Sequence, residues 1–354
     1  MKKTDIFGMS VAELQDALSP FEIPAYRAKQ MAKWMYQAGV QDFSKMTNLP
    51  KDLRERLAEK FVIGMLKLKR RLDSKDGRTT KFLLEFYDGI AVEAVLMRQP
   101  YGNSICVSTQ AGCSMGCAFC ASTLHGLTRD LTAGEILSEA VYINDMLRVE
   151  GEKVSTCVIM GAGEPLINYD NVLAYVHRLH DQDILGMSYR SITLSTSGIV
   201  PAMYRLADEG IPISLSVSLH APYQTLRERI MPIAKKYAIG DVVAAAKHYA
   251  DATKRRVTYE YILIDHLTDG EEEARHLVKL LRGQLASVNL IPINPVEERG
   301  LLRPSERRID AFGRYLRTHH IEVTLRREMG ADINAACGQL RNKYLGKEVE
   351  TIGV

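Results

Sequence analysis

Three cysteines stand close together in the middle of the sequence. Cys113, Cys117 and Cys120 lie in a segment of eight residues that reads Cys-Ser-Met-Gly-Cys-Ala-Phe-Cys. Thiolate is the soft ligand that iron–sulfur clusters require, and such a cluster normally takes four ligands. Three protein ligands on a four-iron cluster leave one iron open to a substrate or a cofactor. The spacing therefore predicts an iron–sulfur site at which chemistry can occur.

A zinc site is the alternative interpretation of the same three cysteines. Structural zinc prefers four ligands, which usually come as two separated pairs. The sequence has six cysteines, and none of the other three forms a second close pair. This pattern favours the iron–sulfur interpretation.

Further polar and small residues follow other predicted strands. Residues 160–165 read Met-Gly-Ala-Gly-Glu-Pro, in which glycine allows close approach of the backbone to a ligand and Glu164 can accept from an ammonium group. Because active sites of barrel folds lie at the carboxyl ends of parallel strands, we expect these residues to share one pocket. Taken singly, each is as well explained as a turn or capping residue. The pocket candidates are Gly163, Glu164, Ser195, Ser218, Leu219, His220 and Asn294.

The elements that must position these residues alternate between strands and helices from about residue 104 onwards. Strands are predicted at Ile105–Thr109, Thr156–Met160, Ser191–Leu194, Ile213–Leu219, Arg256–Leu263 and Val288–Ile293, with a last one at Glu322–Leu325. Helices are predicted at Ala133–Leu147, Tyr169–Leu179, Met203–Asp208, Ile239–Ala252 and Glu271–Arg282. Alternation of this kind indicates parallel βαβ units, and about six units are too few for a closed eight-fold barrel. The fold class is therefore α/β, an open partial (β/α)6 barrel.

Two smaller regions precede the barrel. Helices are predicted at Val11–Leu18, Ala25–Ala38 and Lys51–Phe61, and a β-hairpin joins Lys81–Tyr87 to Ala91–Met97 through the turn Asp88-Gly89. We expect a basic helical domain over residues 1–75, a β-rich extension over 76–100, the barrel over 101–300 and a C-terminal segment over 301–354.

The charge is unevenly distributed along the 354 residues. The net charge is +3, but residues 1–86 hold 17 Lys/Arg against 11 Asp/Glu, a balance of +6. A basic first quarter indicates contact with a polyanion such as RNA, and a solvated helical surface is the plainer alternative. The sequence shows neither a secretory signal nor an apolar run of membrane-spanning length, and its cysteines are too few for a disulfide scaffold. We expect a cytoplasmic protein.

The spacing Cys-x-x-x-Cys-x-x-Cys resembles the signature of the radical S-adenosylmethionine (SAM) superfamily. The resemblance implies a [4Fe–4S] cluster on Cys113, Cys117 and Cys120, whose open iron binds SAM. It also implies that SAM is cleaved to a 5′-deoxyadenosyl radical. Residues 161–165 look like the family motif for the SAM amino group, and the pocket candidates named above match the family's SAM contacts.

The chain also resembles the RlmN family within that superfamily, from Tyr26 to Leu340. The resemblance is carried by Ala336–Leu340 (Ala-Cys-Gly-Gln-Leu), by Cys106–Cys113, and by the motifs at Leu194–Ile199 and Ser218–Pro222. It implies methylation of C2 of an adenosine in 23S rRNA and in tRNAs, with two SAM molecules per turnover. The implied roles are Cys337 as methyl carrier, Cys106 as its disulfide partner and Glu93 as proton acceptor.

Two other functions stay open. A Cfr-like enzyme would methylate C8 of the same adenosine, although Pro165 and the motif Leu194–Gly198 favour the C2 enzyme. A non-catalytic iron–sulfur or zinc protein that binds RNA is the second alternative. We further expect an external one-electron reductant such as flavodoxin, a monomeric state, and an added basic surface from Arg326, Arg327, Arg341 and Lys343. Cys157 lies in an apolar strand and is expected to be a core residue.

Overall fold

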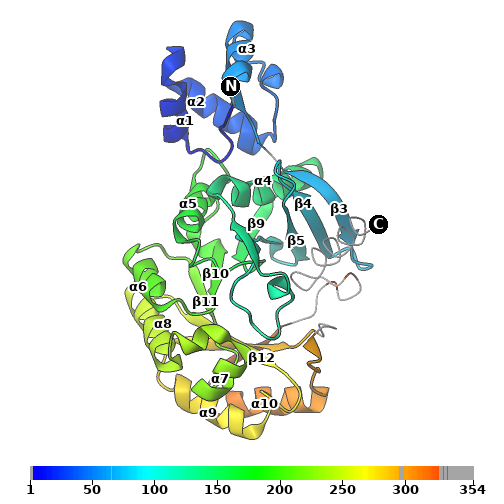
Figure 1. Ribbon diagram of the computed structural model, residues 1–354, viewed down its shortest axis with the longest axis vertical. Helices are drawn as coiled ribbons and strands as arrows, with labels where there is room; N and C mark the ends of the chain where they lie inside the picture. The colour runs from blue at the N-terminus through cyan, green and yellow to red at the C-terminus, as the bar shows by residue number, and fades with distance from the viewer. Residues whose placement is uncertain (1–2, 65, 295–298, 327–329, 331–332, 334–354) are drawn as a thin grey trace.

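In the part of the chain that the structure describes, one twisted sheet of ten strands organises the protein (Figure 1). The computed structural model describes residues 3–64, 66–294, 299–326, 330 and 333. The strands follow the spatial order β14-β13-β12-β11-β10-β9-β6-β5-β4-β3. Their bounds are β3 Lys67–Asp73, β4 Thr79–Glu85, β5 Ala91–Gln99, β6 Gly102–Cys106, β9 Val154–Ile159, β10 Ile192–Thr196, β11 Ser214–Ser218, β12 Val257–Leu263, β13 Ala286–Pro292 and β14 Glu322–Leu325.

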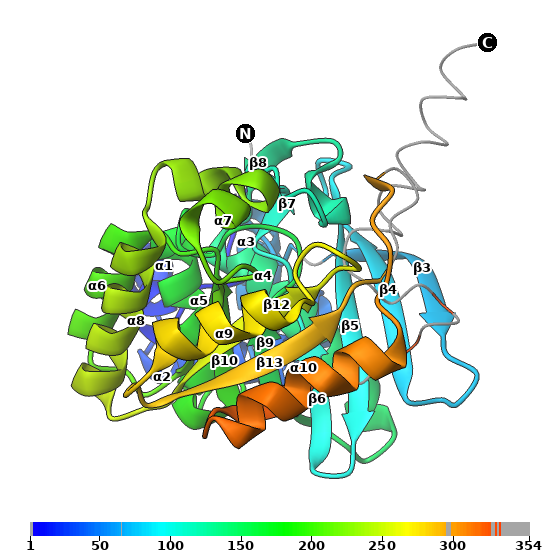
Figure 2. The same cartoon turned by 90° about the horizontal axis from the view of Figure 1, so that it is seen from below.

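Strand β6 and strands β9 to β14 are parallel and form the predicted open barrel. β14 extends the six predicted βα units by a seventh parallel strand. The helices α6, α8, α9 and α10 lie along the outer side of the curved sheet (Figure 2). The helices of this part are α4 Ala133–Val149, α5 Tyr169–His180, α6 Val200–Asp208, α7 Gln224–Ile230, α8 Ile239–Thr253, α9 Glu271–Leu281 and α10 Glu306–Thr318.

The strands β3, β4 and β5 continue the barrel sheet as an antiparallel ribbon. The predicted hairpin is present as β4 and β5, but it is a part of the main sheet and not a separate extension. β3 falls within residues 1–75, which we expected to be helical, and it forms an edge of the sheet. Its run of exposed cations, Lys67, Lys69, Arg70 and Arg71, conceals the alternation that would identify a strand.

The N-terminal helices form a module at one end of the molecule (Figure 1). They are α1 Val11–Leu18, α2 Tyr26–Ala32, which continues as a π-helix over Lys33–Gln37, and α3 Lys51–Lys60. α1 starts with a capping box, in which Ser10 accepts from the Glu13 amide and Glu13 accepts from the Ser10 amide. Two short parallel strands, β1 Thr4–Asp5 and β2 Phe61–Val62, close the module and were not predicted.

The module packs directly on α4 and α5. Gly8 and Gly134 meet backbone to backbone, so neither position has room for a side chain. Ion pairs join Glu13 to Arg178 at 2.9 Å and Lys29 to Asp183 at 3.0 Å. Within the described residues, no helix is long and apolar enough to cross a membrane.

We predict that Gly134→Ala destabilises the protein although alanine favours a helix. The new Cβ would lie 2.6 Å from the carbonyl oxygen of Phe7, so the module and α4 must move apart at a cost of about 1–3 kcal/mol. Gly240 is the matched control, because it also occupies the second position of a helix and has open space where its Cβ would be. Urea unfolding should show Gly240→Ala unchanged or stabilised by up to about 1 kcal/mol. Equal effects of the two changes would contradict the close packing.

Candidate active site

A cavity of about 510 Å³ opens inside the barrel, at the carboxyl ends of its strands. The three cysteines of the predicted cluster site line it together with most of the predicted SAM contacts. Val95, Glu260 and Arg326 also line it, so its wall includes β5, β12 and the residue after β14. The predicted residues that line it are Cys113, Cys117, Cys120, Gly163, Glu164, Ser195, Ser218, His220 and Asn294.

The cysteine loop is the connection of a short hairpin, β7 Gln110–Gly112 with β8 Leu127–Asp130. Asn168 holds the base of this hairpin, since its Nδ2 donates to the carbonyl oxygens of Thr109 at 2.9 Å and Leu131 at 2.7 Å. A hairpin tied at its base presents its connecting loop in a fixed direction. The hairpin itself was not predicted.

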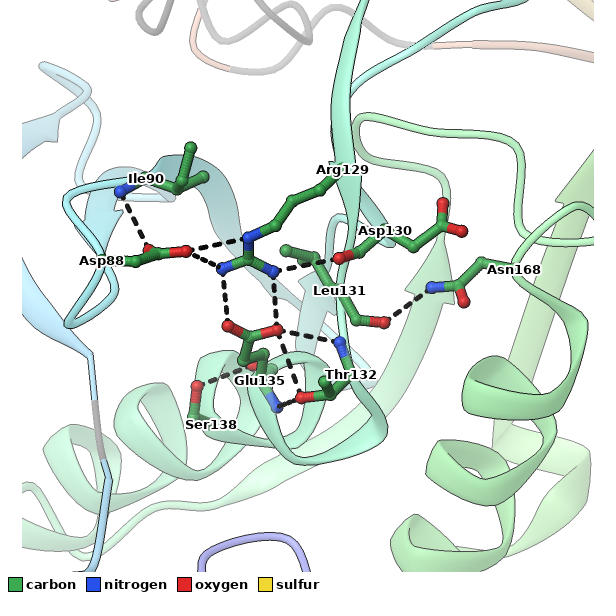
Figure 3. A network of polar contacts seen from close by, with 9 residues as sticks. All are labelled: Asp88, Ile90, Arg129, Asp130, Leu131, Thr132, Glu135, Ser138 and Asn168. Carbon is green, nitrogen blue, oxygen red and sulfur yellow. Dashed lines mark hydrogen bonds and ion pairs between the residues drawn. The ribbon is translucent and has the colours of Figure 1, made fainter. Parts of the chain in front are cut away.

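Arg129 of β8 ties the hairpin to two other elements (Figure 3). Its Nε donates to Asp88 of the β4–β5 turn at 2.9 Å, and its Nη2 donates to Glu135 in the first turn of α4 at 2.7 Å. Glu135 also accepts from the Thr132 amide at 2.8 Å, which makes it part of the cap of α4. These charge-assisted bonds raise the pKa of Arg129 and fix the loop against the sheet.

The surroundings of the cysteine sulfurs suit metal ligation. The amides of Met115 and Gly163 donate to the sulfur of Cys113, and burial raises the pKa of this thiol to about 11. Burial also raises the pKa of Cys117, which packs in an apolar cluster with Ile230 and Met231. The loop is anchored to α7 by the Ala118 amide, which donates to the carbonyl oxygen of Ile230 at 2.9 Å.

Arg227 of α7 is fully buried and connects the ends of two barrel strands. Its Nη2 donates to the carbonyl oxygen of Ser197 at 2.6 Å, and its Nε donates to that of Leu219 at 3.2 Å. Burial lowers the pKa of this guanidinium to about 10, so it stays charged at neutral pH. A buried cation of this kind is stable only while carbonyl oxygens satisfy it. Arg227 therefore fixes the loops that follow β10 and β11.

Glu164 is buried and already has partners within the chain. Its Oε1 accepts from Thr196 Oγ1 at 2.7 Å and from the Leu166 amide at 3.0 Å, and its Oε2 accepts from the Ser197 amide at 2.6 Å. Burial raises its pKa, whereas these bonds favour the charged form. The carboxylate thus joins β9 to β10 at the cavity wall.

The glycine at position 163 serves the chain's own packing. Gly163 has φ +116, and a Cβ there would lie 2.6 Å from Thr109 Oγ1 and 2.8 Å from the Gln110 side chain. The sequence suggested close approach of a ligand as the reason for this glycine. The structure gives a second reason, which is the close passage of the β7 strand.

His220 is held neutral in the cavity wall. Its backbone has φ +60, and its Nδ1 accepts from the Ile262 amide at 3.2 Å, so a neutral ring carries its proton on Nε2. Burial and then the charge of Arg227 lower its pKa to about 3. Phe119 of the cysteine loop packs edge-on against it, with ring centroids 4.7 Å apart.

Two predicted site residues remain. Leu219 does not turn its side chain into the cavity, and Cys337 lies outside the residues that the structure describes. The side chain of Leu219 is buried in the main hydrophobic core, and only its backbone is near the site. Cys337 lies outside the described residues, as do Arg327, Arg341 and Lys343. Cys157 is a fully buried core residue, as predicted, with its sulfur 3.2 Å from the hydroxyl oxygen of Tyr175.

Glu93 and Cys106 share one face of the sheet. Val95 pairs with Cys106 across β5 and β6, and Val95 lines the cavity. Glu93 lies two residues from Val95 on β5, so all three side chains project to the same side. Glu93 forms an ion pair with Lys81 of β4, with 3.0 Å between Nζ and Oε2 and exposures of 6% and 0%. Removing one partner of such a pair typically costs about 3–5 kcal/mol.

Sequence reasoning did not single out three charged residues that lie in or next to the cavity wall. They are Lys81, Arg227 and Glu260, and the last is a buried carboxylate that accepts from Asn289 Nδ2 at 2.8 Å. Arg227 lies in the segment Leu-Arg-Glu-Arg-Ile, which reads as an exposed helix. A charged residue within an apolar strand, as at Lys81 and Glu260, was the one available signal.

Comparison with known proteins agrees with this geometry. Residues 4–63 match the ribosomal RNA large subunit methyltransferase N-terminal domain, and residues 107–278 match the radical SAM superfamily. The fold superposes on the crystal structure of a radical SAM methyltransferase from Sphaerobacter thermophilus with a TM-score of 0.92 and 42% identity, covering 95% of this chain and 98% of that one.

Curated relatives match over nearly the whole chain. The probable dual-specificity RNA methyltransferase RlmN of Symbiobacterium thermophilum is 52% identical over 97% of this chain and 92% of that protein. Its counterpart in Clostridium beijerinckii is 48% identical over 92% of both. The chain belongs to the RlmN family. It is a radical SAM RNA methyltransferase that depends on SAM. This result excludes the alternative of a non-catalytic iron–sulfur or zinc protein that binds RNA.

The RlmN cysteine loop fits the [4Fe–4S] cluster that the radical SAM family implies. Cys113, Cys117 and Cys120 would supply three soft thiolates from one loop facing the cavity. Amide donors aimed at a cysteine sulfur, as at Cys113, are typical of iron–sulfur ligation. Because burial raises the pKa of Cys113 and Cys117, we expect cluster loading to release protons.

We predict that His220→Asn flattens the acid side of the stability curve. The pKa of His220 falls from 6.5 to about 3 on folding, so between these pH values the unfolded chain binds one more proton. Stability must then be lost as the pH falls through this window, by up to about 1.4 kcal/mol per pH unit. Asparagine tolerates the positive φ. Urea unfolding of the cluster-free proteins at several pH values should show the difference, and parallel curves would contradict it.

Proposed function

We propose that this RlmN-family enzyme methylates C2 of an adenosine in 23S rRNA and in tRNAs by a ping-pong mechanism that uses two SAM molecules per turnover. C2 lies between two ring nitrogens and is electron-poor, so it cannot attack an electrophilic methyl group. A methyl group must therefore reach it through a carrier on the protein. The observation that best supports this is the common cavity face of Glu93 and Cys106, beside the cysteine loop.

When bound, the cluster and SAM would supply an electrophilic methyl group and, after one-electron reduction, the ability to remove a hydrogen atom. Cys337 accepts the methyl group as a nucleophile, and the resulting S-bound carbon bonds to C2. Glu93 then takes the C2 proton, and the unpaired electron of the adduct passes to a one-electron acceptor. The Cys106 thiolate attacks the sulfur of Cys337, the electron pair of the carbon–sulfur bond passes to the methylene carbon, a proton completes the methyl group, and the methylated base leaves. The two cysteines remain as a disulfide that an external reductant must reopen.

The proposed SAM contacts are Gly163, Glu164, Ser195, Ser218, Leu219, His220 and Asn294. Six of them line the cavity, and Leu219 would contribute through its backbone. The neutral ring of His220 offers an Nε2–H donor, whereas Ser195 and Ser218 offer hydroxyls that lie 3.5 Å apart. These groups suit the hydroxyl and amine groups of a nucleoside.

RNA is proposed to bind across the N-terminal module and the cavity mouth. The module exposes Lys33, Lys45, Lys51, Arg56 and Lys60, and Arg326 is exposed where it lines the cavity. Phosphate contacts of this kind hold structured RNA, and the target base must leave its stack to reach the cavity.

We propose that residues 1–75, 76–100, 101–300 and 301–354 form four functional regions. β3 belongs to the first region by sequence, but it pairs with the main sheet. We further propose a monomer in the cytoplasm, reduced by a flavodoxin-type protein.

Cys106→Ala should trap the RNA on the protein. Without the Cys106 thiol, the carbon–sulfur bond at Cys337 cannot be broken, so a covalent adduct that resists thiol reductants should accumulate. Denaturing gels detect the adduct and mass spectrometry locates it. Cys157→Ala is the matched control, since Cys157 is a buried cysteine of the next strand and should release product normally.

The same reactions decide between the two adenosine positions. Nucleoside mass spectrometry of RNA from the wild-type reaction should find 2-methyladenosine. A product methylated at C8 would replace the C2 proposal with the Cfr-like one, and absence of an adduct in Cys106→Ala would overturn the ping-pong mechanism.

A further inference from the structure

Lys81 lies on the same face of the sheet as the two groups proposed to act on the adduct, Glu93 and Cys106, and next to Val95, which lines the cavity. It pairs with Val95 across β4 and β5, and Val95 pairs with Cys106 across β5 and β6. Lys81, Val95 and Cys106 therefore form one row across three neighbouring strands. Glu93 stands in the next row of that face, and Lys81 reaches it diagonally, as side chains two residues apart on paired strands can.

The burial of this pair requires an explanation. Lys81 is fully buried, and Glu93 is exposed by only 6%. Well-packed apolar residues of similar size are often at least as stabilising as a buried ion pair, so stability alone is a weak reason for one. Thr79, Val95 and Met97 of this face of β4 and β5 line the cavity, whereas Leu83 and Ala91 of the same face form a small apolar cluster. The pair is therefore placed where a charged carboxylate could take a proton from a substrate in the cavity.

We propose that Lys81 is a positioning residue for proton removal, an inference that rests on the proposed function of Glu93. Lys81 balances the carboxylate charge of Glu93 inside the protein and holds its Oε2. Once the S-bound carbon has bonded to C2, the C2–H bond breaks, its proton bonds to the Glu93 carboxylate and its electron pair restores the aromatic ring, while the unpaired electron of the adduct passes to a one-electron acceptor. Lys81 gains and loses nothing in this step, and its charge remains beside the neutral acid.

The test compares four variants with the wild type: Lys81→Met, Lys81→Arg, Glu93→Gln and the double variant Lys81→Met/Glu93→Gln. General-base catalysis contributes about 10²–10⁴-fold, so Lys81→Met and Glu93→Gln should each slow product release by that order and leave adduct accumulating. Because Lys81 acts through Glu93, the double variant should be no slower than Glu93→Gln alone. Lys81→Arg keeps the charge and should recover most of the rate.

An isotope measurement separates positioning from a purely structural role. With RNA deuterated at adenine C2, removal of the proton becomes rate-limiting in Lys81→Met, so the isotope effect on product release should increase. A structural defect would lower adduct formation and would leave the isotope effect unchanged. The double variant keeps the test valid if Lys81→Met does not fold, because it removes both buried charges together.

Lys69→Met provides the matched control. Lys69 and Glu85 also form a cross-strand pair, with 2.9 Å between Nζ and Oε1, but on β3 and β4 at the outer edge of the sheet. This change should leave product release within about twofold of the wild type.

Three results would overturn the inference, and they are distinguishable. If Glu93→Gln is slow and Lys81→Met is normal, Lys81 has no positioning role and the proposed function stands. Losses that multiply in the double variant would mean that Lys81 acts independently of Glu93. If Glu93→Gln itself is normal, the proposed function of Glu93 fails.

Discussion

The site depends on the pairing register of β4, β5 and β6. Side chains alternate between the two faces of a strand, so a slip of one residue would turn a whole row away from the cavity. The observed register places Lys81, Glu93 and Cys106 on one face. The Ser108 hydroxyl donates to the Glu93 carbonyl oxygen at 2.8 Å and secures the alignment just beyond Cys106. The antiparallel ribbon therefore lines one side of the cavity, with Thr79, Val95, Met97 and Gln99.

The opposite wall is organised by α7. This short helix receives the cysteine loop through the carbonyl oxygen of Ile230, and it sends Arg227 beneath the ends of β10 and β11. Glu164 links the same region to β9 through Thr196 and Ser197. One buried cation and one buried carboxylate thus connect α7 with the segments that follow β9, β10 and β11. Each is satisfied mainly by backbone groups, which fixes loop conformation and not only side-chain position.

The features of the fold and of the site that depend on local sequence pattern could be predicted from the sequence. The spacing of Cys113, Cys117 and Cys120, the alternation of strands and helices, and the motif residues at strand ends were enough for the barrel and for most of the cavity. Lys81 and Arg227 were missed because a charged residue looks solvent-exposed until tertiary contacts bury it. β3 was missed because its exposed cations hide the strand pattern, and the core position of the Leu219 side chain was not foreseen because a motif does not show which of its side chains turns into the core.

The same cations of β3 bear on how the protein behaves at high concentration. An open sheet ends in unpaired backbone groups, and a second molecule could add its own edge to them and so begin an aggregate. Lys67, Lys69, Arg70 and Arg71 place four positive charges along this border, and the register shift between Leu68 and Arg70 makes it irregular. Two identical borders would repel each other and fit poorly. A barrel that stays open enough to admit a large substrate can in this way avoid joining with copies of itself.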